Sequence, residues 1–359
     1  MLPFVSIVVP LLNEQGHVER LMRSLLEQDY PQDRYEILVA DGGSTDATLS
    51  ILKATDTSRR VRLFSNPDRT APAALNALFR ASRGDVIVRV DGHSWVAPDY
   101  LRRIVAVMEE TGEAVVGGPV LMDPDTPFRR ALAQALYASF AVGSVPYRTT
   151  RQRGYVPSLQ TGAYRREVWA AVGPFDESLA VVEDVDYNTR VARAGYRLLI
   201  DPSIRFWYIP RDSPRALWQQ IHGVGRIKVA VLAKHRDIVM PKYFVPSAFE
   251  LALAASLAAR VSGGAAGAAE AAGLIVPGAA AGARRAGVAG SVLPLGYSVL
   301  VLGFAASRLR AIGGAALWLL VIVPVLHVGY GTGFLAGLAR LARRVQRPHM
   351  RTGVPSIEP

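Results

Sequence analysis

Residues 85–93 read Asp-Val-Ile-Val-Arg-Val-Asp-Gly-His, a short β-branched apolar run that stops at an acidic turn. Runs of this kind, bounded by turn residues, are typical of buried strands. We predict a strand over 85–90 that ends at Asp91-Gly92-His93. In open α/β sheets ligands bind at the carboxyl ends of the strands, because loops and helix N-termini converge there. The acidic turn is therefore expected at a ligand site.

Similar runs precede this strand, and segments with helical spacing separate them. We predict strands at Val5–Pro10, Glu36–Ala40 and Val61–Phe64, and helices at 16–28 and Ala71–Ala81. This alternation predicts an α/β fold, a mostly parallel sheet with helices on both faces. Asp41 ends the second strand as Asp91 ends the fourth, so both carboxylates are expected in one crevice. The turn that starts at Asp41 is expected to lead into a helix capped by Ser44 or Thr45.

The next part of the chain continues the pattern less regularly. We predict helices at 98–110 and 183–193 and strands at 114–120 and 197–200. The stretch from 121 to about 160 is expected to be rich in mobile loops. It carries five arginines, at positions 129, 130, 148, 151 and 153.

Composition separates the two ends of the chain. Half of the residues are hydrophobic, 20% are charged and the mean hydropathy is +0.19, which is apolar for a water-soluble globule. Residues 1–242 hold 31 Lys and Arg and 27 Asp and Glu, whereas residues 243–359 hold 10 and 3. The excess positive charge thus belongs largely to the tail, which argues against a nucleic-acid-binding domain.

There is no cysteine, which excludes disulfides, thiolate metal sites and a cysteine nucleophile. Residues 2–12 lack a preceding basic segment, so we do not expect a signal peptide.

Two uncharged stretches near the C-terminus predict membrane spans. Residues 286–307 and 311–339, of 22 and 29 residues, flank Arg308-Leu309-Arg310, and each is long enough to cross ~30 Å of hydrocarbon. The segment 244–283 is weaker and could supply one span, two, or an interfacial hairpin. Before it, 215–236 has the spacing of a basic amphipathic helix, either at the membrane interface or on an ordinary surface.

These features predict four regions. They are a catalytic domain at 1–214, an interfacial helix region at 215–243, a transmembrane region at 244–347 and a tail at 348–359. Basic residues flanking spans favour the cytoplasm. We therefore expect Arg284-Arg285, the tail arginines and the catalytic domain on the cytoplasmic face of the inner membrane. That requires an even number of crossings, two or four, with 308–310 outside.

Six motifs in this order resemble the glycosyltransferase family 2 enzymes of the GT-A fold. They are Val5-Ser-Ile-Val-Val-Pro-Leu-Leu-Asn-Glu14, Ala40-Asp-Gly-Gly-Ser-Thr-Asp46, Ala74-Leu-Asn-Ala77, Asp91-Gly-His93, Thr161-Gly-Ala-Tyr-Arg165 and Glu183-Asp184. The resemblance covers about residues 4–236. With the apolar tail, the chain is similar to the membrane-anchored succinoglycan-biosynthesis branch, which residues 327–337 also resemble. The resemblance implies a Rossmann-like GT-A domain followed by a transmembrane helical region.

The resemblance also implies a site for a nucleotide diphosphate sugar. The residues implied for donor binding are Pro10, Asn13, Glu14, Asp41, Arg69, Asn76, Asp91 and Gly162. Among them, Pro10, Glu14 and Asp41 would line the pocket for the base and ribose. Gly162 would let the backbone approach the sugar closely. Arg69 could equally be a solvated loop residue.

A divalent cation and a general base complete the implied chemistry. Asp91 and His93 occupy the place of the family's Asp-x-Asp, which holds a cation that stabilises the leaving diphosphate. His93 replaces the second acid. Imidazole favours Mn²⁺ over Mg²⁺, whereas the carboxylate suits both ions. The expected cofactor is therefore a divalent cation, Mn²⁺ or Mg²⁺. Asp184 would take the proton of the acceptor hydroxyl. Glu183 would orient the loop or touch the sugar, and the implied displacement inverts the anomeric centre.

One departure from the family concerns processive members, which carry Gln-x-x-Arg-Trp. Here residues 219–228 lack the Arg-Trp pair, which favours the addition of a single sugar. His222 and Arg226 in this stretch could touch the diphosphate or a lipid phosphate, or be structural.

We therefore expect an inverting, metal-dependent transferase. It would move one hexose, most readily from a UDP-sugar, to a lipid-linked or glycan acceptor in cell-surface polysaccharide biosynthesis. The partners are thus the donor, the acceptor and membrane lipid, with no nucleic acid. Two alternatives stay open: transfer onto a polyprenyl phosphate, and a non-catalytic membrane scaffold with a degenerate nucleotide-sugar site.

Overall fold

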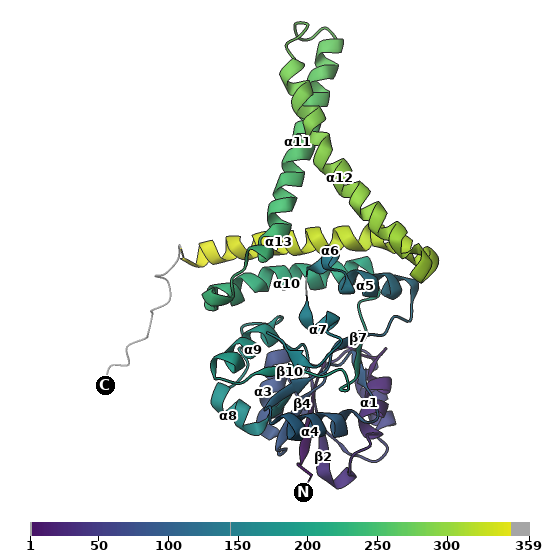
Figure 1. The fold of residues 1–359 in the computed structure, drawn as a ribbon, viewed down its shortest axis with the longest axis vertical. Coiled ribbons are helices and arrows are strands. Elements are labelled where there is room, and N and C mark those ends of the chain that lie inside the picture. The colour runs from purple at the N-terminus through teal and green to yellow at the C-terminus, as the bar shows by residue number, and fades with distance from the viewer. Residues whose placement is uncertain (1, 144, 346–359) are drawn as a thin grey trace, which may run out of the picture. The chain divides into compact units, whose positions relative to one another are not determined.

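The computed structural model describes residues 2–143 and 145–345 (Figure 1). The chain forms two compact units that divide between Asp212 and Ser213, and each is described by itself. The predicted tail 348–359 and Arg347 lie outside the described residues.

The first unit is built on a sheet that has eight strands within the described residues. In spatial order they are β3 (Val61–Ser65), β2 (Tyr35–Asp41), β1 (Val5–Leu11), β4 (Val86–Arg89), β9 (Ala163–Arg165), β6 (Val115–Gly117), β10 (Leu198–Ile200) and β8 (Gly154–Tyr155). The first four are parallel to one another, and β6 is parallel to β10, whereas β9 and β8 run antiparallel to their neighbours. The predicted mostly parallel sheet is confirmed.

A second, smaller sheet lies beside the first. Its strands, in spatial order, are β5 (Ser94–Val96), β11 (Phe206–Tyr208) and β7 (Val120–Met122). The prediction of one strand over 114–120 is wrong, because β6 and β7 belong to different sheets. The chain breaks at Gly118, where an added Cβ would lie 1.7 Å from the carbonyl oxygen of Ile204. No side chain fits this approach, so residue 118 must be glycine where the chain passes from one sheet to the other.

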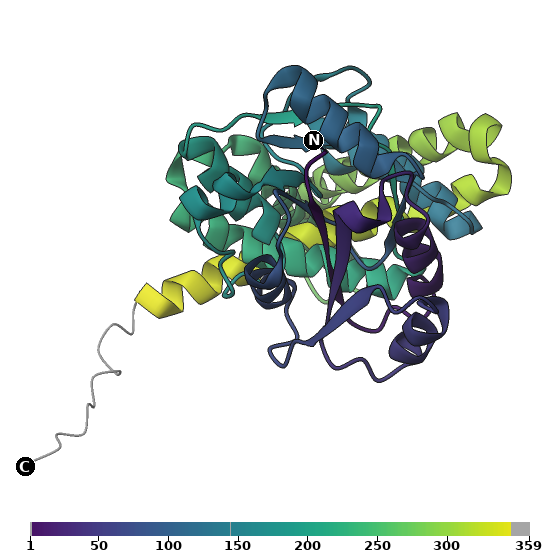
Figure 2. The ribbon, with the colours of Figure 1, turned by 90° about the horizontal axis from the view of Figure 1, so that it is seen from below.

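Helices cover both faces of the large sheet (Figures 1 and 2). They are α1 (Val18–Leu26), α2 (Thr48–Thr55), α3 (Ala71–Ala81), α4 (Tyr100–Thr111), α8 (Arg166–Val172) and α9 (Glu183–Arg193), with a 3₁₀ turn η1 (Gln32–Arg34). On one face, Leu75, Phe79 and Tyr187 pack with Val8 and Ile87 in a fully buried cluster. Ile7 and Val9 alternate with Val8 and point to the opposite face. The sheet is thus buried on both sides, as a parallel sheet requires.

The segment predicted to be loop-rich contains regular structure instead. It holds α5 (Pro127–Tyr137), α6 (Ser139–Val142) and α7 (Pro146–Thr149). Thr126 caps α5 by accepting the N–H of Arg129. The Arg129 side chain is buried, and its guanidinium donates to Asp125 and to the carbonyl of Pro210. Phe128, Leu132 and Leu136 recur four residues apart on the buried face of α5, a helical pattern that the prediction overlooked.

The second unit consists of helices. They are α10 (Pro214–Lys234), η2 (Arg236–Ile238), η3 (Pro241–Tyr243), α11 (Val245–Ala271), α12 (Ala281–Ile312), η4 (Gly313–Trp318) and α13 (Leu319–Val345). Arg308–Arg310, predicted to form a loop, lie inside α12, and the helix ends at Gly313, where φ is +57°. Among the described residues, two helical stretches are long and apolar enough to cross a bilayer, Val245–Ala271 and Ala281–Arg343.

Glycines set the helix packing in this unit. Gly329, Gly333 and Gly337 recur every four residues on α13, and added Cβ atoms there would contact Trp218, His222 and Arg226 on α10. The two helices therefore run parallel in close contact. Gly263 of α11 meets Gly287 of α12, and Gly290 meets Ser256, so these helices form an antiparallel hairpin. Small residues at such contacts are typical of helices that pack in membranes.

Candidate active site

The carboxyl ends of β1, β2 and β4 meet at one edge of the sheet. Leu11 pairs with Asp41, so β1 and β2 end at the same level. Arg89, the last residue of β4, pairs with Val8, so β4 ends three residues earlier and the acidic turn 91–93 follows alongside the end of β1. The turn after β4 packs on the end of β1, because a Cβ at Gly92 would lie 2.8 Å from Leu11 and 3.0 Å from Glu14. The predicted acidic turn thus lies against the 10–14 segment.

Asp41 organises the loop after β2. Its carboxylate accepts the N–H groups of Gly43 (2.9 Å) and Ser44 (3.0 Å) and the Ser44 hydroxyl (2.6 Å). Asn13 joins this loop to the end of β1, since its Oδ1 accepts the N–H of Thr45 at 2.9 Å. The predicted capping by Ser44 or Thr45 is wrong. The Ser44 hydroxyl is used by Asp41, and α2 begins at Thr48, whose N–H is accepted by Asp46.

Glu14 and His93 form a hydrogen-bonded pair between β1 and the acidic turn. The Glu14 Oε1 lies 3.0 Å from His93 Nδ1, and the imidazole packs edge-on against Tyr208 with ring centroids 5.1 Å apart. An ionised carboxylate only accepts, so Nδ1 carries the proton in this bond. In the neutral imidazole, the other ring nitrogen, Nε2, then presents a lone pair. This is the arrangement of histidines that bind metal ions.

Arg89 is a site residue that the sequence analysis missed. Its Nε donates to Asp91 Oδ1 (2.9 Å), and its Nη2 donates to Glu183 Oε1 (2.7 Å). All three side chains are buried, with 7% of Arg89 exposed. Burial opposes the charge of Arg89, but the carboxylates of Asp91, Glu183 and Asp184 outweigh it and raise its pKa. Removing one partner from such a buried pair costs about 3–5 kcal/mol, so the three groups act as a unit.

A signal for Arg89 was present in the sequence. It is the charged residue inside the apolar run 86–90, and arginine is almost never fully buried unless it is paired. The run therefore required buried acids nearby. Asp91 follows two residues later, but Glu183 is 94 residues away, so no local pattern in the sequence predicts it as a partner of Arg89.

Asp184 approaches the same place from α9. Val182, directly before the helix, has φ +63° and ψ 17°, a left-handed conformation that turns the chain into α9. The Asp184 carboxylate lies near enough to contribute to the raised pKa of Arg89 and, after burial, to that of Tyr147 in α7. Asp91 and Glu183 are therefore bonded to one guanidinium, and Asp184 follows Glu183 in the first turn of α9, within electrostatic reach of that guanidinium.

Comparison with known proteins identifies the family of this chain. The profile of glycosyl transferase family 2 matches residues 6–170. The succinoglycan biosynthesis protein ExoA of Rhizobium meliloti is 32% identical over 256 residues, which cover 69% of this chain and 77% of ExoA. This chain belongs to glycosyl transferase family 2. The resemblance predicted from the motifs is confirmed, and the chain is a glycosyltransferase by family.

A second sequence relative and one solved structure are also similar to this chain. A Methanococcus voltae protein named dolichyl N-acetyl-α-D-glucosaminyl phosphate 3-β-D-2,3-diacetamido-2,3-dideoxy-β-D-glucuronosyltransferase is 24% identical over 240 residues, covering 64% of this chain and 74% of that protein. The mannosyltransferase PcManGT of Pyrobaculum calidifontis, solved with GDP-Man and Mn²⁺, has a TM-score of 0.51 and 23% identity. The match covers 91% of this chain and 87% of that one. Its likeness confirms the GT-A fold.

The other residues predicted to bind the donor lie on or next to the strand ends that carry Asp41 and Asp91, except Asn76. The carbonyl of Gly162 accepts the Arg89 N–H at 3.0 Å, and Arg69, with φ +57°, lies 3.4 Å from the position of a Cβ on Gly43. Pro10 is in β1, one residue before its end. Asn76 is different. Its buried amide bonds Phe175 twice, at 2.8 and 3.0 Å, and Glu177 at 2.7 Å, so we leave it out of the proposed donor site.

His222 and Arg226 belong to the second unit of the glycosyltransferase. The His222 ring stacks near Trp218, with centroids 6.2 Å apart. The Nε of Arg226 is buried and has no hydrogen-bond partner in the described part of the chain. Their contact with a phosphate stays a prediction.

The donor set for a cation in the glycosyltransferase is small. Within residues 2–143 and 145–345, no group of three or more His, Asp or Glu side chains is arranged as a metal site. Asp91 has one oxygen without a partner in this described part of the chain, and His93 presents Nε2. Two protein ligands fit a cation that is also bound by diphosphate oxygens and water.

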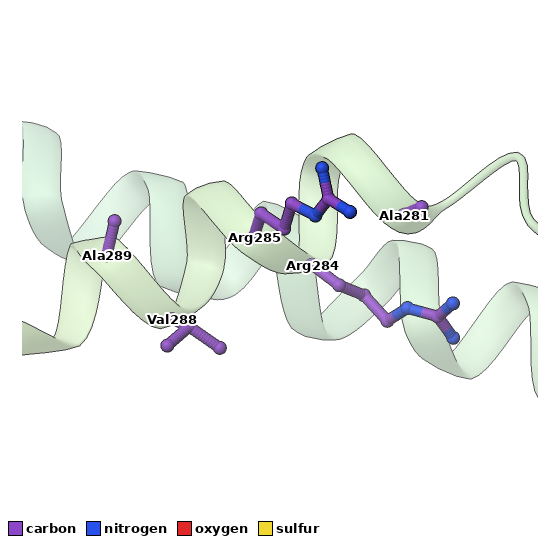
Figure 3. Close-up of a pocket in the computed structure, with 5 residues that line it drawn as sticks. All are labelled: Ala281, Arg284, Arg285, Val288 and Ala289. Atoms are coloured by element: carbon purple, nitrogen blue, oxygen red, sulfur yellow. The ribbon is translucent and has the colours of Figure 1, made fainter.

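A separate hollow of about 570 Å³ lies on α12 of the glycosyltransferase (Figure 3). Ala281, Arg284, Arg285, Val288 and Ala289 line it. Arg284 pairs with Glu270 at 3.3 Å. None of the predicted site residues lines this hollow, so we do not regard it as the donor site.

Proposed function

We propose that this glycosyltransferase moves a single hexose from a nucleotide diphosphate sugar, most readily a UDP-sugar, to a lipid-linked or glycan acceptor in cell-surface polysaccharide biosynthesis. One observation carries the proposal. Arg89 joins Asp91 and Glu183, and the Glu14–His93 pair lies on the same acidic turn, all at the carboxyl edge of a GT-A sheet.

In this proposal the donor lies over the ends of β1, β2 and β4. Pro10, Asn13, Glu14 and Asp41 lie at the nucleotide end, with Arg69 and Gly162 nearby. Asp91 and His93 would hold a divalent cation, Mn²⁺ or Mg²⁺, which stabilises the charge of the departing diphosphate when bound. The Mn²⁺ complex of PcManGT supports this choice.

Asp184 is the proposed general base. It accepts the proton of the acceptor hydroxyl as that oxygen attacks the anomeric carbon, while the bond from the sugar to the diphosphate breaks. One displacement of this kind inverts the anomeric centre. The absence of Arg-Trp near residues 219–228 supports the transfer of one sugar rather than polymerisation.

The relatives support the acceptor class. ExoA is named for succinoglycan biosynthesis, and the Methanococcus voltae relative is named for a dolichyl-phosphate-linked sugar. The first name supports a polysaccharide product, and the second supports a lipid-linked acceptor. A lipid-linked acceptor also suits a chain with apolar helices long enough to reach through a bilayer.

A donor screen tests the function. The full-length protein in detergent or nanodiscs is incubated with UDP- and GDP-sugars, Mn²⁺ or Mg²⁺, and polyprenyl-diphosphate-linked sugars. We expect one nucleotide sugar to be consumed and one sugar to be added to the lipid-linked acceptor. Transfer onto a polyprenyl phosphate itself would replace the proposed acceptor. Absence of both nucleotide-sugar binding and turnover would overturn the assignment.

We also propose that the α11–α12 hairpin crosses the inner membrane. Apolar side chains along it, Leu257, Val261, Val288, Val292 and Val299, are between 46% and 73% exposed. Exposed apolar surface on this scale marks a membrane or protein contact. The hairpin accounts for two crossings, an even number, which keeps unit 1 and the C-terminus in the cytoplasm.

In this topology α13 does not cross, although 311–339 is the longest uncharged stretch. From Gly329 to Gly337 it packs directly along α10. That part of α10 carries Arg226 and Lys228, and each would cost about 2.5–3.5 kcal/mol at the centre of a bilayer. Both helices therefore lie at the interface. The turn at 272–280 and Arg284-Arg285 then face outward, which reverses the orientation expected from the sequence.

The lack of cysteine makes labelling a clean test. Val276→Cys lies in the hairpin turn, and Val239→Cys, between α10 and α11, is the matched control. Both side chains are exposed. A membrane-impermeant maleimide should label Val276→Cys in intact spheroplasts, and Val239→Cys only after permeabilisation. Labelling of neither variant in intact spheroplasts would restore the orientation expected from the sequence.

A further inference from the structure

Val182 has an unusual backbone conformation. Among the described residues, four non-glycine residues have positive φ, namely Asn13, Arg59, Arg69 and Val182, and Val182 is the one with a β-branched side chain. Such a residue in the left-handed region is a genuine outlier. Strain of this kind persists where the surroundings hold the residue in place, and it clusters at functional sites.

The residue after Val182 is fixed by a buried ion pair. Glu183 is buried, and its Oε1 accepts a charge-assisted hydrogen bond from Arg89 at 2.7 Å. Arg89 is itself fixed, because it is the last residue of β4, inside the sheet, and its Nε is bonded to Asp91. The Arg89–Glu183 pair therefore ties the first turn of α9 to a central strand. Asp184 follows directly and takes its position from this anchor.

We propose that Arg89 is a positioning residue that fixes Asp91 and, through Glu183, the strained turn that presents Asp184. The proposal rests on the function proposed above, in which Asp91 serves the donor and Asp184 is the base. The guanidinium of Arg89 then sets the distance between Asp91, which serves the donor, and Asp184, the general base. Glu183 acts through Arg89 and is also a positioning residue, not a second base.

The fork of the guanidinium is essential to this role. Arg89 uses Nε for one carboxylate and Nη2 for the other. A lysine at this position keeps the positive charge, but its ammonium is a compact point charge that lacks the planar fork. Arg89→Lys should therefore lower kcat by about 10–100-fold, with a smaller change in KM, because a misplacement of about 1 Å can cost that much.

A rescue experiment separates positioning from chemistry. Glu183→Gln weakens the anchor at nearly constant shape, and we expect kcat to fall about 10–100-fold while the donor KM changes little. Adding Val182→Asn should recover at least several-fold in kcat, because asparagine adopts the left-handed conformation with much less strain and needs less holding. Arg59→Asn, at another left-handed residue, is the matched control and should change neither parameter.

The outcomes are distinct. Recovery in the double variant supports the proposal, because a lost base or sugar contact cannot be restored by a backbone change. If the double variant is no more active than Glu183→Gln while both remain folded by thermal melting, the positioning role is overturned. Asp184→Asn is measured in parallel. If that variant keeps full activity, the proposed function itself fails, independently of Arg89.

Discussion

Two buried acidic clusters lie at opposite edges of the large sheet. At the amino edge, Glu36 receives hydrogen bonds from the Ser6 hydroxyl (2.7 Å), the Arg83 N–H (2.8 Å) and Arg62 (2.7 Å), and Arg83 also contacts its second oxygen at 3.2 Å. Both carboxylate oxygens thus have two donors. At the carboxyl edge, Asp91 and Glu183 each use one oxygen, on the shared Arg89.

The difference shows how to tell a structural acid from a functional one. Both clusters contain buried carboxylates paired with arginine, so charge and burial do not separate them. What differs is the number of carboxylate oxygens that can still accept a hydrogen bond or bind a ligand. Glu36 has its acceptor sites filled by protein donors, whereas Asp91 and Glu183 each keep an oxygen that has no partner in residues 2–143 and 145–345. Only the carboxyl edge can offer oxygens to a ligand.

The largest expected effect is at the carboxyl edge. Asp184→Asn should lower kcat by about 10²–10⁴-fold, because general-base assistance is lost. Thermal melting should change little, since the variant keeps the shape of the side chain. Sugar transfer is measured against Asp33→Asn, an exposed control on η1. A drop of less than tenfold would contradict the role of Asp184 as general base.

Glu14→Gln should weaken the metal site. The neutral amide oxygen of glutamine is a weaker acceptor for the His93 Nδ1–H than a carboxylate, and changes to such partners of metal-binding histidines typically cost about 10–100-fold in metal affinity. Mn²⁺ binding is read by the paramagnetic resonance signal of the free ion, with and without the nucleotide diphosphate. Glu19→Gln, exposed on α1, is the control. Unchanged Mn²⁺ affinity would remove Glu14 and His93 from the cation site.

Glu36→Gln should affect stability and not chemistry. Its donors are partly left without a charged acceptor, and hydrogen bonds to charged groups contribute about 1.5–3 kcal/mol each. We expect a lower melting temperature with unchanged kcat/KM at temperatures where the variant is folded. Loss of kcat/KM in the folded variant would show that the amino edge has a part in the site.

The smallest expected effect is the pH dependence of that stability. Burial raises the pKa of Glu36, but hydrogen bonds from Ser6, Arg83 and Arg62 outweigh burial and hold the pKa below its ordinary value of 4.5. The ionised form therefore stabilises the fold above that value, and this contribution is lost as the pH falls through the lowered pKa. The difference in melting temperature between wild type and Glu36→Gln should shrink below about pH 4.5. A constant difference across that range would contradict it.

Local signals predicted much of the first unit. The helices Ala71–Ala81 and 183–193 were expected with the bounds that α3 and α9 have, because apolar spacing and terminal residues are short-range features. Asp41 and Asp91 were expected at one sheet edge, since each ends a β-branched run. The small sheet was not expected. Its three-residue strands pair Ser94–Val96 with Phe206–Tyr208, more than 100 residues apart in the chain.

The amino-acid sequence by itself determined the fold class, the family and the edge at which the acids gather, because hydrophobic periodicity and motif order are local properties. Tertiary structure alone decided which carboxylates have all their oxygens hydrogen-bonded. Glu36 accepts from Ser6 and Arg83, and Glu183 accepts from Arg89, through contacts between residues 30 to 94 positions apart in the chain. A hydrogen bond depends on the direction and distance of two groups in space, and the separation of residues along a chain does not contain that information.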